Sequence, residues 1–169
     1  MSFAVTVLEY FILHRDMLFV SSSTGIAKSG IDVNITIDNS GIIETDTGER
    51  RHVICDWKIS ERFTLPGGTK VVTIKAHNDA DGHVGAILAS FSIDVVTDES
   101  WECAEMAWCC DSGDCKSEAN WKPAEIYGNN SVHTRPWGTI NKKNTIRTKA
   151  QWIWVSNSQA KRVWCKKIF

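Results

Sequence analysis

The sequence lacks an excess of charge of either sign. Its 169 residues carry a formal net charge of −1, and acidic and basic residues are interspersed along the chain. A nucleic-acid-binding domain usually presents a basic face to the phosphates, so the charge argues against that function class. Hydrophobic residues make up 43% of the chain and charged residues 23%, which indicates a folded globular protein. The length fits one domain over residues 1–169.

Motifs of common catalytic sites are lacking as well. The chain contains no Gly-x-Ser-x-Gly elbow, phosphate-binding loop, dinucleotide fingerprint or His-Glu-x-x-His sequence. A glycosidase needs two carboxylates that face each other across a sugar, and the acidic loops of this chain could in principle supply them. Nothing else in the sequence points to catalysis. We therefore expect a binding protein and not an enzyme.

A long uncharged hydrophobic run is also absent. The apolar stretch of residues 1–20 is interrupted by Glu9, has no basic start and is too short and too charged to span a bilayer. We expect it to form opening strands at residues 3–12 and 17–20, and we expect no membrane insertion. If the protein is secreted, its signal peptide would already have been removed from this sequence.

What the sequence does contain is a succession of short β-rich segments. Val, Ile, Thr, Trp and Phe dominate them with partial period-two alternation, and no segment keeps a helical period. Turn-forming residues separate the segments at intervals of about ten residues, which predicts an all-β sandwich of the jelly-roll type. Residues 128–149 are predicted to form a long surface loop. The other predicted strands are 31–37, 42–45, 57–65, 70–76, 84–93, 101–107, 124–127, 151–155 and 162–169.

Tryptophan is unusually frequent, with eight residues against two tyrosines. Large amphipathic rings serve in cores, in interfaces and as platforms for sugars. We expect core packing for the tryptophans on or beside predicted strands and exposure for Trp137, which lies in the long loop. The tryptophans associated with strands are Trp57, Trp101, Trp121, Trp152, Trp154 and Trp164.

Counting the predicted strands favours one end of the sandwich as a binding end. If consecutive strands run antiparallel, successive loops alternate between the two ends. The loops at residues 46–52, 77–83 and 108–115 then share one end, which is rich in carboxylates and planar polar side chains. The opposite end is the second choice of site, and it offers Asp38, Asn39, Asp98 and Glu99.

The chemistry of the favoured end suits a sugar held together with calcium. Calcium takes about six to eight oxygen ligands, which carboxylates in flexible turns and the hydroxyls of a sugar could supply. The alternative is that these residues only form turns or lie in solvated loops and bind no ligand. The predicted sugar-binding residues are Glu49, Arg50, His52, Asn78, Asp79, His83 and Trp108, the last by stacking. The predicted metal ligands are Asp79, Asp81, Asp111 and Asp114.

Six cysteines without a Cys-x-x-Cys pair indicate disulfides of an extracellular domain more than a zinc site. Cys109 and Cys115 could close a small loop, which would leave Cys55 and Cys110 for each other. An intermolecular bridge from Cys55 or Cys110 stays open, whereas a bond between the adjacent Cys109 and Cys110 would be strained. We expect a secreted protein.

Several segments resemble galactose-binding-like jelly-roll domains. The resemblance lies within residues 31–169 and is carried by FTLPGGTKVVTIKAHN, VGAILASFSIDVVTDESWEC, NWKPAEIYGN, RPWG, AQWIWVSN and VWCKKIF. The segment IDNSGIIETDTGERRHVICDW departs from the more aromatic hairpin usual in that family, so the resemblance does not carry over a ligand site at this hairpin.

More narrowly, the size and the acidic loops resemble the small calcium-dependent, galactose-binding lectins of sea anemones. This resemblance implies a lectin that binds terminal galactose or β-galactosides of glycans and forms a homodimer. The family resemblance also implies a disulfide between Cys103 and Cys165. The alternative is a structural or protein-recognition module of the same fold that has no sugar ligand.

Overall fold

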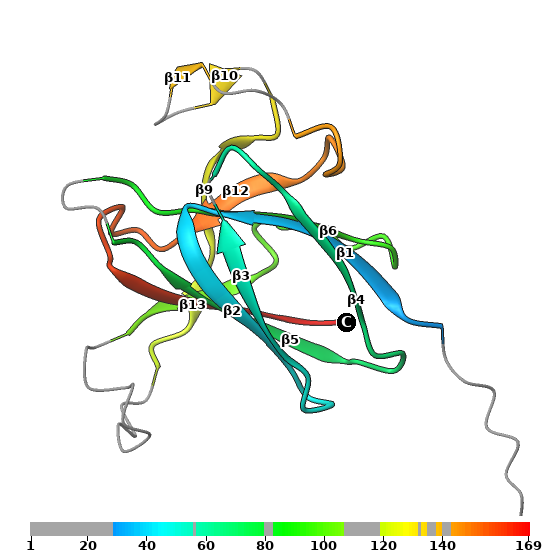
Figure 1. Ribbon diagram of the computed structural model, residues 1–169. Coiled ribbons are helices and arrows are strands. Elements are labelled where there is room, and N and C mark those ends of the chain that lie inside the picture. Colours follow the sequence, from blue (N-terminus) through cyan, green and yellow to red (C-terminus); the bar gives the residue numbers. More distant parts are fainter. Residues whose placement is uncertain are drawn as a thin grey trace, which may run out of the picture.

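The computed structural model describes residues 29–55, 57–79, 83–106, 119–131, 133–134, 138–139 and 143–169. This part of the chain contains β-strands and no helix, and the strands form two antiparallel sheets and one small hairpin (Figure 1). The prediction of an all-β sandwich is therefore confirmed, while the jelly-roll connectivity stays a prediction. In the same residues no helix is long and apolar enough to cross a membrane. The strands predicted within residues 1–20 lie outside the described residues.

The first sheet has five strands, of which β1, β4 and β6 lie to the right of β2 and β3 in Figure 1. Val33, Ile35 and Ile37 alternate with polar residues along its second strand and are fully buried, as expected for a strand with one face in the core. In spatial order the strands are β4 (Glu61–Leu65), β1 (Ile31–Ile37), β6 (Ile87–Phe91), β12 (Gln151–Trp154) and β9 (Glu125–Asn129).

The second sheet has six strands, and its inward residues also alternate with outward ones. In spatial order its strands are β3 (Arg50–Cys55), β2 (Asn39–Thr45), β5 (Val71–His77), β13 (Arg162–Ile168), β7 (Glu102–Glu105) and β8 (Lys122–Pro123). The hairpin of β10 (His133–Thr134) and β11 (Gly138–Thr139) extends beyond both sheets at the top of Figure 1.

The main core lies between the two sheets. Ile43, Ile74 and Val163 of the six-stranded sheet and the rings of Trp101 and Trp154 are fully buried there. The ring of Trp154 packs directly on the backbone at residue 85, since a Cβ atom added to Gly85 would lie 2.5 Å from the Trp154 ring. Glycine is therefore required by close approach at this position.

A disulfide joins two neighbouring strands of the six-stranded sheet. Cys103 of β7 pairs directly with Cys165 of β13, their Cα atoms are 4.1 Å apart, and both residues are buried. The pairing implied by the family resemblance is thus confirmed. The proposed partners Cys109 and Cys115 lie outside the described residues.

A second apolar cluster covers the outer face of the five-stranded sheet. Leu88 and Trp152 project from that face, and Ile146 and Ala150 pack on them from the segment 143–150. Buried Asn130 holds the segment in place through hydrogen bonds with the backbone of residues 143–147. The prediction of a surface loop over 128–149 agrees with the turns of residues 143–149 and is wrong for the residues that belong to β9, β10 and β11, because these pair with neighbouring strands.

Four observed strands have no predicted counterpart, namely β3 and the two-residue strands β8, β10 and β11, and the other observed strands agree with predicted ones to within a few residues. β3 was not predicted, because Arg50, Arg51 and His52 were interpreted as a solvated loop. β3 is an edge strand of the six-stranded sheet, and edge strands commonly carry charged residues.

Candidate functional site

Of the three loops expected to form the binding end, residues 108–115 lie outside the described residues, and the loops 46–52 and 77–83 lie at opposite ends of the six-stranded sheet. The strand register pairs Thr45, at the end of β2, with Val72, near the start of β5. The turn 46–49 therefore lies beside the start of β5, whereas Asn78 follows the end of β5. The prediction that both loops share an end is wrong, since the missed strand β3 shifts the alternation of loops by one.

The predicted residues Glu49, Arg50 and His52 belong to the β2–β3 hairpin. The backbone N–H of Glu49 donates to Thr45 Oγ1 at 3.1 Å and closes the turn. Arg50 Nε lies 3.4 Å from Glu44 Oε1, and the side chain of Arg50 is largely exposed. Arg50 and His52 project from the outer face of the sheet because Val53, which alternates with them, is buried.

The predicted residues Asn78, Asp79 and His83 lie together at the other end. Asn78 is buried, its amide donates to the carbonyl oxygen of His83 at 2.8 Å, and its Oδ1 accepts from Asn39 at 3.0 Å. These bonds tie the loop after β5 to the start of β2. Asn78 therefore supports the loop, and the exposed residues Asp79 and His83 remain available beside it.

The other predicted site residues lie outside the described residues, so the calcium and stacking predictions stay predictions. Among the side chains that the structure describes, no group of three His, Cys, Asp or Glu residues is placed to hold a metal ion. The undescribed site residues are Asp81, Trp108, Asp111 and Asp114.

The four residues of the second choice of site were also predicted to share one end of the sandwich. The structure places two of them at each end. Asp38 is buried, and Asn39 bonds to Asn78, at the end where the loop after β5 lies. Asp98 and Glu99 lie at the opposite end, on the rim of a hollow of 520 Å³. Lys149, Gln151 and Lys167 also line this hollow.

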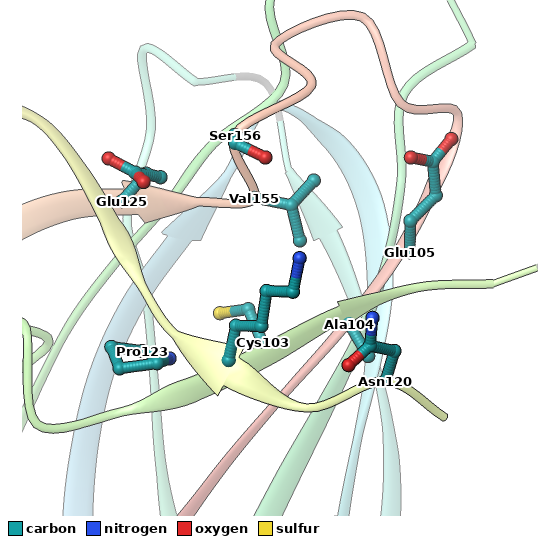
Figure 2. A pocket seen from close by; sticks show the side chains of 9 residues that line it. Cys103, Ala104, Glu105, Asn120, Pro123, Glu125, Val155 and Ser156 are labelled. Carbon is teal, nitrogen blue, oxygen red and sulfur yellow. The ribbon is translucent and has the colours of Figure 1, made fainter. Parts of the chain in front are cut away.

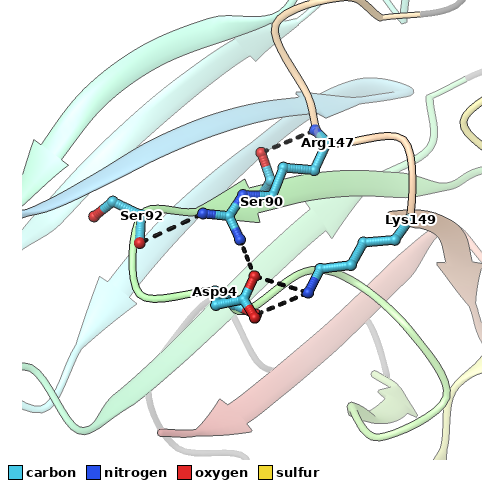
Figure 3. A network of polar contacts seen from close by, with 5 residues as sticks. All are labelled: Ser90, Ser92, Asp94, Arg147 and Lys149. Carbon is cyan, nitrogen blue, oxygen red and sulfur yellow. Dashed lines mark hydrogen bonds and ion pairs between the residues drawn. The ribbon is translucent and has the colours of Figure 1, made fainter.

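A polar network around Asp94 holds one wall of the hollow (Figure 3). Asp94 Oδ1 accepts from Lys149 Nζ at 2.8 Å and forms an ion pair with Arg147. The guanidinium of Arg147 also donates to the carbonyl oxygen of Ser92, and its backbone N–H donates to Ser90 Oγ at 3.4 Å. The cations of this wall are thus engaged in fastening the segment 143–150 to the turn after β6.

Three exposed carboxylates accept hydrogen bonds that depress their pKa. The hydroxyl of Thr64 and the guanidinium of Arg62 lower the pKa of Asp32 below its ordinary 3.8. Backbone N–H groups of Lys70 and Val71 lower the pKa of Asp46, and the hydrogen bond and charge of Lys149 lower the pKa of Asp94. Each charged carboxylate is therefore favoured in the folded protein over the unfolded chain.

The depressed pKa values make stability depend on pH in a defined direction. Their contribution is fully present above the unfolded pKa of 3.8 and is lost as the pH falls through the folded values. The variant Asp46→Asn keeps an acceptor oxygen but has no proton to gain. We expect it to be less stable than the wild type at pH 6, and we expect this difference to shrink below pH 4. Urea unfolding at a series of pH values measures the difference, and a difference that stays constant or grows toward low pH would contradict the assignment.

A smaller pocket of 200 Å³ lies where the edge strands of the two sheets approach each other (Figure 2). Glu105 and Glu125 lie on opposite sides of it, and Lys122, Asn120 and Ser156 complete its polar lining. The Glu105 carboxylate already accepts from Asn157 Nδ2 at 3.2 Å. Among the described residues that line the pocket there is no aromatic ring to serve as a platform for a sugar.

The outer face of the six-stranded sheet carries two half-buried tryptophans. Val163 and Cys165 of β13 point into the core, so Trp164 and Lys166 point outward. Trp121 directly precedes the edge strand β8, and its ring lies on the same face because Lys166 Nζ is 4.2 Å from the ring centroid. The expectation of core packing is confirmed for Trp101, Trp152 and Trp154, which are fully buried, but not for these two residues.

Each of the two rings is contacted by its own lysine, and each lysine forms an ion pair with a glutamate. Lys75 Nζ lies 4.4 Å from the centroid of the Trp164 ring and 2.6 Å from Glu44 Oε2. Lys166 Nζ lies 4.2 Å from the centroid of the Trp121 ring and 3.2 Å from Glu102 Oε2. We call these the Trp164 group (Trp164, Lys75, Glu44) and the Trp121 group (Trp121, Lys166, Glu102). Each group places an indole, an ammonium and a carboxylate within one patch of surface, with formal charges that cancel.

Two further features of the sheet shape this face. Arg50 of the edge strand β3 also contacts Glu44 and adds one positive charge beside the Trp164 group. A depression of 280 Å³ borders the Trp121 group and is lined by Ser100, Glu102, Lys166, Lys167 and Ile168. The groups therefore lie on an accessible and slightly hollowed surface.

Comparisons of this chain with family models, with curated proteins and with solved structures found no match.

Proposed function

We propose that this protein binds carbohydrate and holds the glycan on the outer face of its six-stranded sheet. The observation that carries the proposal is the repeated combination of a half-buried tryptophan, a lysine and a glutamate in the Trp164 and Trp121 groups. The proposal keeps the lectin function expected from the sequence and moves its site from the loops to the sheet.

The chemistry of each group matches that of a sugar ring. An indole offers a flat apolar surface on which the C–H face of a pyranose can stack. A lysine only donates hydrogen bonds and a carboxylate only accepts them, whereas adjacent sugar hydroxyls do both. The lysine and the glutamate of each group cancel in formal charge, which suits a neutral polyhydroxyl ligand, and Arg50 adds one positive charge beside the Trp164 group.

The lysines do not bar a sugar from the rings. An exposed cation–π contact contributes about 0.5–1 kcal/mol, so moving an ammonium off the ring costs little. Lys75 Nζ and Lys166 Nζ lie over the ring faces, so a stacking sugar must displace them, and Glu44 and Glu102 can then hold the displaced ammonium groups beside each ring. There they can donate to the hydroxyls of a stacked sugar.

The predictions of the sugar, of calcium, of secretion and of a homodimer belong to the same proposal. We propose terminal galactose or β-galactosides as the first sugars to test, and calcium as a requirement supplied by the acidic loops. Secretion agrees with the Cys103–Cys165 disulfide, because disulfides persist in oxidising compartments. A homodimer and the absence of catalysis stay predictions.

A glycan array, read with calcium and with a chelator, tests the proposal. We expect binding by the wild type, and loss of about tenfold or more in affinity for Trp164→Ala and Trp121→Ala. A chelator that abolishes the signal supports the calcium requirement, and an unchanged signal overturns that requirement alone.

The variant Trp57→Ala is a matched control. Trp57 is also half-buried with lysines nearby, at 5.2 Å for Lys58 and 5.8 Å for Lys143, but it packs on the Leu88–Trp152 cluster of the other sheet. We expect this variant to keep its affinity for glycans. If no glycan binds with calcium or with chelator, the proposal is overturned and a protein-recognition module is favoured. If all three variants lose the same affinity, the site does not lie on this face.

A further inference from the structure

The two tryptophans of the outer face lie in one row that runs across the strands. Trp164 pairs with Ala104 of β7 in the sheet register. Lys122 of β8 pairs with Cys103, so Trp121, one position earlier, comes beside Ala104 on the other side. The row therefore places a small buried residue between two large rings.

The row continues beyond Trp164 on the same face. Lys75 of β5 pairs with Trp164, Ile42 of β2 pairs with Lys75, and His52 of β3 pairs with Ile42. All of them alternate with buried neighbours and so project outward. The face thus offers a continuous strip that crosses the sheet from one edge strand to the other.

The register also sets the spacing of the two rings along this strip. Trp164 and Trp121 are two strands apart, and neighbouring strands are separated by just under 5 Å, which places the backbones that carry the two rings about 10 Å apart. This spacing is close to the length of two sugar units in an extended β-linked chain. A chain laid along the strip would stack its first and third units on the rings and pass its second unit over Ala104.

On the basis of the proposed function, we infer that the ligand is an extended, neutral chain of β-linked sugars, of which a terminal galactose would fill only one position. The repetition of the ammonium and the carboxylate supports this inference. The Trp164 group has Lys75 and Glu44, and the Trp121 group has Lys166 and Glu102, so the same donor and acceptor recur beside each ring. A ligand that repeats its own chemistry along its length can satisfy both groups at once, whereas a monosaccharide can occupy only one.

The depression beside the Trp121 group gives the chain room to continue. It shares Ser100 and Lys167 with the larger hollow of 520 Å³, where Glu99 and Gln151 lie on the rim. The polar rim thus extends from the strip toward the end of the sandwich. A ligand that turns from the strip at the Trp121 group can therefore make further polar contacts along β13 and β7.

Calorimetry with oligosaccharides of increasing length tests the inference. The probes are glucose and galactose and their β-1,4-linked oligomers of two, four and six units, titrated into the full chain. We expect affinity to rise by about tenfold or more between the disaccharide and the tetrasaccharide, because only the longer chain reaches both rings. In Trp121→Ala the dependence on length should disappear while weak binding at Trp164 remains.

Two further variants make the outcome specific. Trp121→Phe keeps a flat ring and should retain most of the gain with length, while Trp57→Ala should retain all of it. Equal affinity of the wild type for the monosaccharide and the hexasaccharide would overturn the extended-chain inference and leave the proposed function standing. No binding of any oligomer, with other glycans bound on the array, would overturn the inference as well. No glycan binding at all would overturn the proposed function itself.

Discussion

Replacing both Cys103 and Cys165 with alanine is expected to lower the free energy of unfolding by about 4 kcal/mol, because the disulfide closes a long loop. The two cysteines are 62 positions apart in sequence, so the cross-link removes many conformations from the unfolded chain. It connects β7 directly to β13, and both sulfur atoms lie in the core. The double variant avoids an unpaired thiol, and each alanine still fits the buried positions.

Chemical unfolding of the wild type and the double variant measures this effect. Reduction of the wild type before unfolding should lower its stability toward that of the variant, since both lose the same cross-link. A difference below about 1 kcal/mol between the oxidised wild type and the double variant would show that the cross-link does not restrain the unfolded chain as expected.

The variant Asn130→Ala is expected to destabilise the protein by about 3 kcal/mol, because it removes all the hydrogen bonds that this buried amide makes with the segment 143–147. The Asn130 amide donates to the carbonyl oxygens of Lys143 at 3.0 Å and Ile146 at 2.9 Å. Its Oδ1 accepts from the backbone N–H of Lys143 at 2.9 Å. Loss of these bonds should release the segment 143–150 and expose the second apolar cluster, which includes Trp152.

Hydrogen exchange together with urea unfolding measures this effect. In Asn130→Ala the amides of residues 143–150 should lose protection first, while those of β5 and β13 stay protected. Asn129→Ala is the matched control, since Asn129 is exposed and contacts Gln151 at 3.2 Å. A control variant as unstable as Asn130→Ala would show that the neighbourhood, and not the buried amide, holds the segment.

Much of the fold was predictable because turn residues and β-branched residues act locally. The predicted strand 31–37 coincides with β1, and β5, β12 and β13 were placed to within one residue at each end. β3 was missed because its charged residues are tolerated only by virtue of its edge position, which is a property of the sheet. That single omission was enough to assign the loops to the wrong ends.

The candidate site was predictable in part. Once Cys165 is placed in the core, period-two alternation puts Trp164 and Lys166 on the outer face, and the sequence contains that signal. The contact of Lys166 with Trp121 depends on the pairing of β13 with β7 and of β7 with β8. These residues are far apart in the chain, and no local pattern reports their register.

The measurement that tests the central claim most directly is a glycan titration followed by the indole N–H signals of the eight tryptophans. We predict that a glycan bound by the wild type shifts the signals of Trp121 and Trp164 and leaves those of the buried Trp101, Trp152 and Trp154 in place. Shifts confined to other residues, such as Trp57 or the backbone amides around Asn78, with Trp121 and Trp164 unchanged, would contradict binding on the outer face of the six-stranded sheet.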